Sequence, residues 1–269
     1  MIIGIMPNFE IENVQKTAEI LKSKLIDSGM AVLLVNGKSK EIPNMIISIG
    51  GDGTYLHTMR YAIEEGVPVL GMNMGRLGFL TQFDFEGIDR AVSLIKNNEY
   101  TIEERCIEDI KVYRNGENVF HDLAFNDLVI YRNKMKMLDL EIHVDDSYVT
   151  SVYGDGLIVA TPTGSTAYSL SAGGPIIEPE SEVLALTPIC PHSVNSRPMV
   201  ISDKKNIRIC LKETRASVQQ RSASISTDGT ESFNIAGKDE IIIRKSELRA
   251  KVVKLYQTDF YKILREKFL

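Results

Sequence analysis

A glycine-rich turn that directly follows an apolar run constrains this chain more than any other feature. The run Met45–Ile49 has the length and composition of a buried strand, and it leads straight into Gly50-Gly51-Asp52-Gly53-Thr54. Glycines here let a strand end bend sharply into a helix, and they leave backbone N–H groups free to meet a phosphate. The sequence therefore predicts a strand, a turn and a helix, with Gly53 among the bare backbone donors and Asp52 as the carboxylate of the turn.

The lone carboxylate favours one class of chemistry. A carboxylate at such a turn can accept a proton from a substrate hydroxyl or hold a magnesium ion, and both tasks belong to phosphoryl transfer. The alternative is that Asp52 only caps the following helix. We favour the first interpretation, because two adjacent glycines exceed what a cap requires. His57 lies about a turn and a half further along the predicted helix, within reach of a phosphate on the turn.

Composition places the chain among ordinary globular proteins. Its 269 residues are 43% hydrophobic and 25% charged, which suffices for one large or two medium domains. The net charge of −5, without a basic cluster, argues against a nucleic-acid or membrane partner. The three cysteines are far apart and match neither a disulfide framework nor a zinc site, and the first residues do not resemble a signal peptide. We expect a cytoplasmic protein that binds small ligands.

The hydrophobic pattern changes near residue 100. Before it, short apolar runs alternate with helical patterns, expected at about 14–25, 54–65 and 86–97, which predicts a parallel sheet packed with helices. After it, strand-like runs separated by turns such as Asn115-Gly116 predict antiparallel hairpins. We expect an α/β domain over residues 1–99 and 250–269, and a β-rich domain over residues 100–249.

A hydroxyl-rich stretch follows the predicted buried strand Leu157–Ala160. It runs over Thr161–Pro175, where Pro162 ends the strand and Gly164 permits a turn into a helix with free N–H groups. Short hydroxyls beside the ring of Tyr168 suit a nucleoside, whose base stacks and whose sugar needs hydrogen bonds. The alternative is a serine- and threonine-rich surface loop.

Three other sequence features can each be interpreted in two ways. Asn126-Asp127 interrupts the strand predicted over Leu123–Tyr131, and it marks either an open site or a bulge or strand end, because burying such groups unpaired costs about 1–3 kcal/mol each. Gly71–Leu80 is either a ligand loop at the end of a strand or an ordinary connection. His192 fits a ligand role and a structural role equally well.

Together these motifs resemble the NAD kinase family. The order and spacing match over Gly50–Thr54, Asn126-Asp127, Gly154-Asp155-Gly156, Thr161–Pro175 and Pro191–Pro198. The glycine-rich turn alone is shared with diacylglycerol and sphingosine kinases and, more loosely, with phosphofructokinases, but the hydroxyl-rich stretch is not. The resemblance covers nearly the whole chain. It implies an α/β domain with a Rossmann-like parallel sheet plus a β-rich, β-sandwich-like C-terminal domain.

The resemblance also implies an activity and a site. It implies an ATP-dependent kinase that phosphorylates the 2′-hydroxyl of the adenosine ribose of NAD to give NADP, with Asp52 as proton acceptor and Mg²⁺ as the expected metal. Whether Asp52 acts as base, metal ligand or both stays open. The implied NAD contacts are Asn126, Thr163, Thr166 and Ala167 at the adenine, Asp127 at a ribose hydroxyl, Phe79 over the adenosine, and Asp155, Tyr168, Ser171 and Cys190 at the nicotinamide end. A homotetramer is implied too, in which Asp155 and Cys190 act across an interface.

The chain departs from the family pattern at three positions. Asp127 stands where many members carry Glu, Tyr153 where a basic residue is common, and Thr230 where Gln is frequent. Two rival functions stay open on the sequence. A lipid kinase would need an apolar substrate entrance, and a noncatalytic NAD sensor would use the same pocket without turnover.

Overall fold

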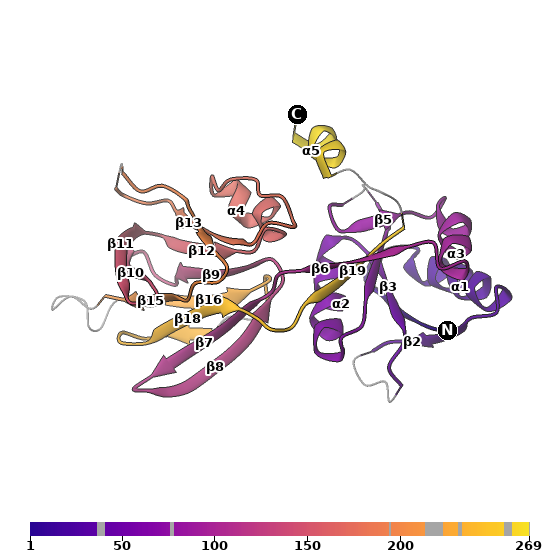
Figure 1. Ribbon diagram of the computed structural model, residues 1–269, viewed down its shortest axis with the longest axis horizontal. Coiled ribbons are helices and arrows are strands. Elements are labelled where there is room, and N and C mark those ends of the chain that lie inside the picture. The colour runs from indigo at the N-terminus through magenta and orange to yellow at the C-terminus, as the bar shows by residue number, and fades with distance from the viewer. Residues whose placement is uncertain are drawn as a thin grey trace. The chain divides into compact units, whose positions relative to one another are not determined.

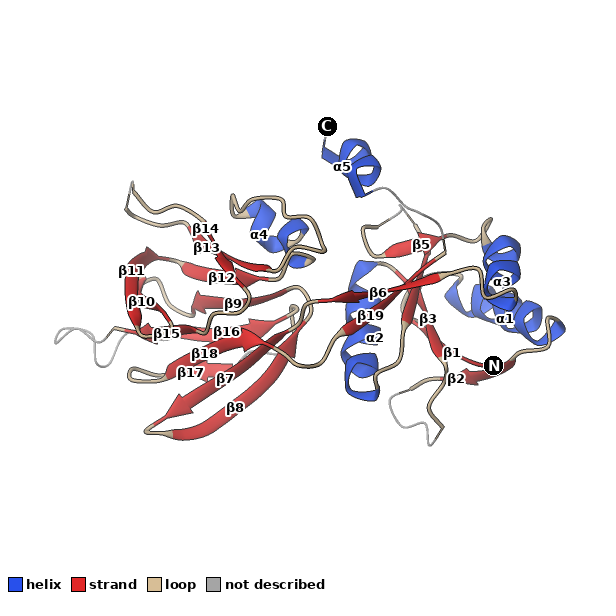
Figure 2. Cartoon of the chain, in the orientation of Figure 1, coloured by secondary structure: helices blue, strands red, loops and turns tan. Residues whose placement is uncertain are grey.

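The chain folds into two compact units (Figures 1 and 2). In the computed structural model, residues 1–36, 41–75, 78–193, 195–212, 223–230, 233–255 and 260–268 are described. One unit comprises Met1–Arg105 and Leu248–Leu269, and the other comprises Cys106–Glu247. Both parts of the expected fold class, an α/β unit and a sheet-rich unit, are confirmed.

A seven-stranded sheet forms the centre of the first unit. Its order is β2-β1-β3-β4-β19-β6, with β5 on β4. β1, β2, β3, β4 and β5 pair in parallel, and every residue of β3 and β4 is buried, as a parallel sheet covered by helices requires. The strands are β1 (Ile2–Pro7), β2 (Ala31–Leu34), β3 (Met45–Gly50), β4 (Val69–Asn73), β5 (Thr81–Phe83), β6 (Thr101–Arg105) and β19 (Ala250–Lys254).

The helices of this unit are α1 (Val14–Asp27), α2 (Asp52–Glu65), α3 (Ile88–Lys96) and α5 (Phe260–Phe268). α1 buries Val14, Ala18, Leu21 and Leu25, which is the apolar stripe that its sequence spacing predicts. Residues of α1 and α3 share one core cluster with β1, β3 and β4. Among the described residues, no helix is long and apolar enough to cross a membrane.

The strand β6 belongs to the first unit although it follows the expected boundary at residue 100. It pairs antiparallel with β19, Ile102 lying opposite Val253 (Figure 1). The returning strand β19 also pairs in parallel with β4. The local sequence of β6 could not show this, because its partner comes from the other end of the chain.

The second unit is a sandwich of two six-stranded antiparallel sheets. One has the order β11-β10-β15-β18-β7-β8 and the other β14-β13-β12-β9-β16-β17, and their inner faces share one apolar core. The strands are β7 (Glu108–Arg114), β8 (Glu117–Ala124), β9 (Asp127–Arg132), β10 (Leu138–Val144), β11 (Ser147–Gly154), β12 (Gly156–Ala160), β13 (Val183–Ile189), β14 (Met199–Ser202), β15 (Ile207–Leu211), β16 (Ala223–Thr227), β17 (Phe233–Ile235) and β18 (Glu240–Lys245).

Turn chemistry explains one hairpin of this unit. Asn115 and Gly116 join β7 to β8 with φ of 52° and 84°, the left-handed values that an Asn-Gly hairpin turn needs. The run Leu123–Tyr131 is not one strand, as expected, but the end of β8 and most of β9. We did not predict β11, β13, β14 or β17.

Candidate active site

The glycine-rich turn joins β3 to α2. The helix begins at Asp52, two residues earlier than predicted, and Gly51 is its N-cap with φ of −111°. Gly50, Gly51 and Gly53 are not among the glycines of the described chain that have a positive φ. Glycine is therefore not needed at these positions for a left-handed backbone conformation. A Cβ on Gly50 would overlap the Thr54 side chain, whereas Gly51 and Gly53 face open space. The first N–H groups of α2, which have no intrahelical acceptor, therefore lie beside an uncrowded backbone.

The Asp52 carboxylate does not cap its own helix. Instead it accepts hydrogen bonds from the N–H groups of Phe79 at 3.2 Å and Leu80 at 3.3 Å, so the interpretation as a simple cap is wrong. A Cβ on Gly78 would overlap the carboxylate, which means that only glycine allows the loop to approach so closely. Two long hydrogen bonds leave further lone pairs on a carboxylate for a ligand.

The loop Gly71–Leu80 therefore packs on the glycine-rich turn. Met74 N–H donates to the Gly50 carbonyl at 3.0 Å, and Phe79 is half-buried. The Lys267 ammonium of α5 lies 4.5 Å from the centroid of the Phe79 ring. Residues 76 and 77 of this predicted ligand loop lie outside the described residues.

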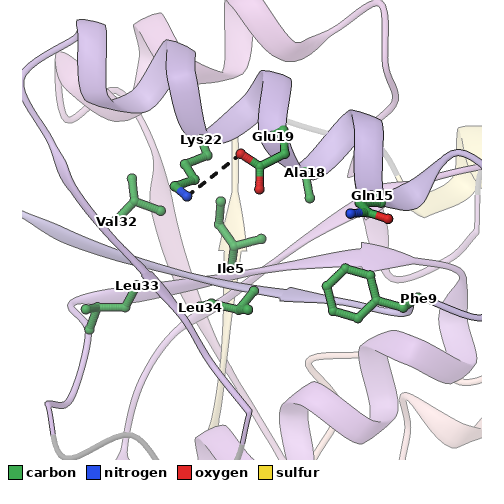
Figure 3. A pocket seen from close by; sticks show the side chains of 9 residues that line it. All are labelled: Ile5, Phe9, Gln15, Ala18, Glu19, Lys22, Val32, Leu33 and Leu34. Atoms are coloured by element: carbon green, nitrogen blue, oxygen red, sulfur yellow. Dashed lines mark ion pairs between the residues drawn. The ribbon is translucent and has the colours of Figure 1, made fainter.

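A cavity of about 550 Å³ adjoins α2 at the carboxyl ends of β1 and β2. Its lining includes His57 and Arg60 of α2. Figure 3 shows a second cavity, of about 320 Å³, between α1 and β2, where Lys22 and Glu19 form an ion pair. Phe9 and Leu34 line both cavities. His57 is exposed, so its imidazole is accessible to a ligand.

Asn126 and Asp127 lie at the break between β8 and β9, so the strand-end explanation of this pair holds. Their exposed fractions are only 8% and 5%. The Asp228 carboxylate, in the turn after β16, accepts the N–H groups of Phe125, Asn126 and Asp127 at 2.8, 2.7 and 3.2 Å. The Asn126 Oδ1 atom is buried without a hydrogen-bond partner among the described residues. Such an orphan acceptor is what a donor group on a ligand would satisfy.

The hydroxyl-rich stretch packs directly against Asn126. Thr161 N–H donates to the Asn126 carbonyl at 2.9 Å, and a Cβ on Gly164 would overlap that same carbonyl. Gly164 is therefore needed for close approach between two segments, not for a left-handed turn. The helix predicted here is short, because a 3₁₀ turn over Gly164–Thr166 is followed by α4 (Tyr168–Ser171).

The side chains of this stretch divide into structural and accessible ones. Ser165 and Ser169 are fully buried: Ser165 Oγ donates to the Pro162 carbonyl at 2.6 Å, and Ser169 Oγ lies 2.8 Å from Thr187 Oγ1. The surface-loop interpretation is therefore wrong. The residues predicted to contact NAD are the accessible ones: Thr163, Thr166 and Ala167 are half-buried, and Tyr168 and Ser171 are exposed.

A third group of predicted residues, Asp155, Cys190 and His192, lies at the opposite end of β12. Arg132 Nε donates to Asp155 Oδ1 at 2.7 Å, while Cys190 and His192 are exposed. β12 separates this group from Asn126 by the five residues Gly156–Ala160. At about 3.3 Å per residue the two groups are roughly 20 Å apart. One copy of the chain does not bring them together.

Burial and like charge shift two acidic groups behind Asn126. Burial, reinforced by the Asp228 carboxylate, raises the pKa of Asp127 to about 7. Glu108 of β7 is fully buried, and both of its carboxyl oxygens lack a hydrogen-bond partner among the described residues. Burial first, then the charges of Asp127 and Asp228, raise the pKa of Glu108 well above its usual range. The nearby Leu128 N–H, which makes no hydrogen bond of ordinary geometry to Glu108, opposes this shift. The site therefore favours the protonated form of Glu108.

The described residues contain no group of three or more His, Cys, Asp or Glu side chains that could hold a metal ion. Asp52 is the carboxylate at the glycine-rich turn, so a metal ion there would have at most this one acidic ligand from that turn. Such a donor set fits Mg²⁺, which commonly takes one or two carboxylates together with phosphate oxygens and water.

Sequence reasoning missed four residues that shape these sites: Asp228, Glu108, Gly78 and Arg132. Asp228 sits in Thr227-Asp228-Gly229-Thr230, and a polar turn with an Asp before Gly could have drawn attention to it. Gly78 lies inside a loop that we had singled out. No sequence signal identifies Glu108 or Arg132, because their partners come from distant strands.

Comparisons with known proteins give one consistent answer. The ATP-NAD kinase N-terminal domain model matches residues 35–100, and the ATP-NAD kinase C-terminal domain model matches residues 125–255. A protein named NAD kinase from Caldicellulosiruptor bescii is 40% identical, covering 99% of this chain and 99% of its own length. Another from Ruminiclostridium cellulolyticum is 39% identical, covering 98% of this chain and 96% of its own length.

Solved structures agree in fold. The crystal structure of an NAD kinase from Archaeoglobus fulgidus in complex with ATP matches with a TM-score of 0.78 and 28% identity, covering 99% of this chain and 98% of that one. Yeast NADH kinase complexed with NADH matches with a TM-score of 0.88 at 22% identity, covering all of this chain and 88% of that one. The resemblance seen in the sequence motifs is confirmed, and the chain belongs to the NAD kinase family of phosphotransferases.

Proposed function

We propose that this chain transfers the γ-phosphate of ATP to the 2′-hydroxyl of the adenosine ribose of NAD, giving NADP and ADP. The observation that carries the proposal is the Asp52 carboxylate, held by two long backbone hydrogen bonds beside the open backbone of Gly51 and Gly53. In phosphoryl transfer an enzyme chiefly positions the reactants and neutralises charge. Asp52 accepts the hydroxyl proton in this proposal.

The NAD site in our proposal uses the residues grouped around Asn126. Asn126 Oδ1, which has no hydrogen-bond partner among the described residues, accepts a hydrogen bond from the adenine amino group. Asp127 accepts a hydrogen bond from a ribose hydroxyl. Thr163, Thr166 and Ala167 flank the adenine in this arrangement, while Tyr168 and Ser171 face the nicotinamide end. Phe79 covers the adenosine. The cavity lined by His57 and Arg60 adjoins the same helix as Asp52 and takes the donor in this proposal, because the Arg60 guanidinium suits a phosphate.

Mg²⁺ is the metal that we propose, held mainly by the phosphate oxygens of the donor, with Asp52 as the protein group able to join them. When bound, it would neutralise charge on the transferred phosphate. The residues of the chain keep their own tasks of positioning the nucleotides and accepting the proton.

We also propose a homotetramer in the cytoplasm. The support for assembly is that Asp155, Cys190 and His192 lie at the far end of β12 from Asn126, so a second copy is needed for them to complete an NAD site. Light scattering on the purified protein tests the tetramer, and cell fractionation tests the location. A monomer that turns over NAD would refute the assignment of these three residues.

One assay separates the proposed kinase from its rivals. Purified protein with NAD, ATP and Mg²⁺ should yield NADP, whereas bound NAD without NADP indicates a sensor, and phosphorylation of a lipid alone indicates a lipid kinase. The variant Asp52→Asn should lose about 10²-fold or more in turnover while NAD binding is largely kept. Asp27→Asn, at the exposed end of α1, is the matched control. Turnover near the wild-type level in Asp52→Asn would remove Asp52 from catalysis.

A further inference from the structure

The break between β8 and β9 is held by one side chain from a distant turn. Both oxygens of the Asp228 carboxylate are used: Oδ1 accepts the N–H groups of Asn126 and Asp127, and Oδ2 accepts that of Phe125. The backbone N–H of Asp228 in turn donates to the Asp127 carbonyl at 3.0 Å. Four hydrogen bonds therefore join one residue to three consecutive residues, and three of them have a charged acceptor, the stronger class of hydrogen bond.

This anchoring extends to the hydroxyl-rich stretch. The Asn126 carbonyl accepts the Thr161 N–H at 2.9 Å, and Thr161 Oγ1 donates to the Phe125 carbonyl at 2.6 Å. Gly164 lies so close to Asn126 that a side chain there would overlap it. A shift of Phe125–Asp127 would therefore move the start of the stretch as well, and with it the residues assigned to the adenine.

Carboxyl groups crowd the same corner. The charge of Asp228 acts on Asp127, and the charges of both act on Glu108 of β7. Asp122 of β8 accepts the Thr227 hydroxyl nearby, and β12, the other neighbour of β9, has no charged residue over Gly156–Ala160. Asp228 adds a further negative charge to this corner, which raises the electrostatic repulsion among the carboxyl groups. The three backbone hydrogen bonds that Asp228 accepts offset this repulsion.

We propose that Asp228 is a positioning residue of the kinase reaction, which orients Asn126 and Asp127 for the adenosine of NAD. It does so without contacting the reacting atoms. The inference rests on the proposed function, because it assumes that Asn126 and Asp127 bind NAD. It adds a residue that the assigned NAD contacts do not include, and it predicts that damage at Asp228 is confined to NAD recognition.

The test is the variant Asp228→Asn, assayed for KM with NAD, KM with ATP and kcat. An amide has one acceptor oxygen, so the variant can keep two of the three hydrogen bonds but sets its NH₂ group against a backbone N–H. We expect KM for NAD to rise by about ten-fold or more, which is the factor for losing one charged hydrogen bond. KM for ATP should change by less than about two-fold, since the donor does not touch this corner in our proposal.

The pH profile gives a second readout that a purely structural role would not move. Asp127 accepts a hydrogen bond from a ribose hydroxyl more strongly when it is ionised, so KM for NAD should rise as the pH falls through about 7. Removing the Asp228 charge lowers the pKa of Asp127, so this acid limb should shift to lower pH in Asp228→Asn. An unshifted limb contradicts the inference.

The matched control is Asp239→Asn. Asp239 is buried, whereas Asp228 is half-buried; Asp239 pairs with Arg114 and accepts the Ala236 N–H at 2.8 Å, but it holds a different turn of the same unit. Asp239→Asn should cost stability and leave KM for NAD unchanged. A rise in KM for NAD in both variants would show a general loss of structure and overturn the inference.

Two outcomes separate this inference from the proposed function. If wild-type protein makes no NADP, the proposed function fails; if it is active and Asp228→Asn has the wild-type KM for NAD, only the positioning role fails. Should the variant not fold, amide hydrogen exchange on the wild-type chain decides. The N–H groups of Phe125, Asn126 and Asp127 should then exchange as slowly as those of the adjoining strands, and fast exchange would overturn the anchor.

Discussion

Replacing Glu108 by leucine should stabilise the β-rich unit. Glu108 is 0% exposed, shares the inner face of β7 with Ile110 and Val112, and leaves both carboxyl oxygens without a hydrogen-bond partner among the described residues. A buried polar group without a partner costs about 1–3 kcal/mol. Leucine has a similar volume and no polar atom, so Glu108→Leu should raise the free energy of unfolding by about 1–3 kcal/mol at pH 7.

The gain should depend on pH, and its sign follows from the raised pKa of Glu108. In the unfolded chain this carboxyl ionises around its ordinary value of 4.5, whereas in the folded chain burial and the neighbouring carboxylates raise its pKa well above that value. The unfolded state therefore releases a proton that the folded state retains, and wild-type stability falls as the pH rises above about 4.5. Neither Glu108→Leu nor the isosteric Glu108→Gln carries this pH-dependent penalty.

Urea unfolding followed by circular dichroism, at about pH 5 and about pH 8, measures the effect. The stability difference between Glu108→Leu and wild type should widen at the higher pH. Glu108→Gln should reproduce the widening with a smaller gain, because its amide is still unpartnered. If Glu108→Leu is less stable than wild type, or if the difference is the same at both pH values, the description of Glu108 as an unpaired buried acid with a raised pKa is refuted.

Two glycines offer further tests. Gly78→Ala places a methyl group against the Asp52 carboxylate and should lower kcat by about ten-fold or more. The control Gly75→Ala changes the same loop where a Cβ meets open space, and it should leave kcat unchanged. Equal losses in both variants would contradict a specific contact between Gly78 and Asp52. Gly164→Ala forces Asn126 away, so we expect the free energy of unfolding, measured by thermal unfolding, to fall by about 1–3 kcal/mol and KM for NAD to rise. A wild-type KM would argue against the close approach of Gly164 and Asn126.

Local features were predictable from the sequence, and distant pairings were not. The turn after Met45–Ile49 and the apolar stripe of α1 depend on neighbouring residues, so their patterns could be recognised. β6 was assigned to the wrong unit because its place depends on β19. The role of Gly164 was misjudged for the same reason, since it is required by the distant Asn126 that packs against it rather than by its own φ.

The two aspartates that accept backbone hydrogen bonds, Asp52 and Asp228, are held to different degrees. Asp228 accepts three backbone N–H groups, two of them at 2.8 Å or less, and its lone pairs are largely committed to the fold. Asp52 accepts only two, both at 3.2 Å or more, beside glycines whose missing side chains leave room. Because hydrogen bonds weaken with length, the Asp52 carboxylate is oriented but keeps lone pairs for a ligand. A carboxylate that must take a proton and release it again needs this looser hold, which is why Asp52 and not Asp228 is suited to face the substrate hydroxyl.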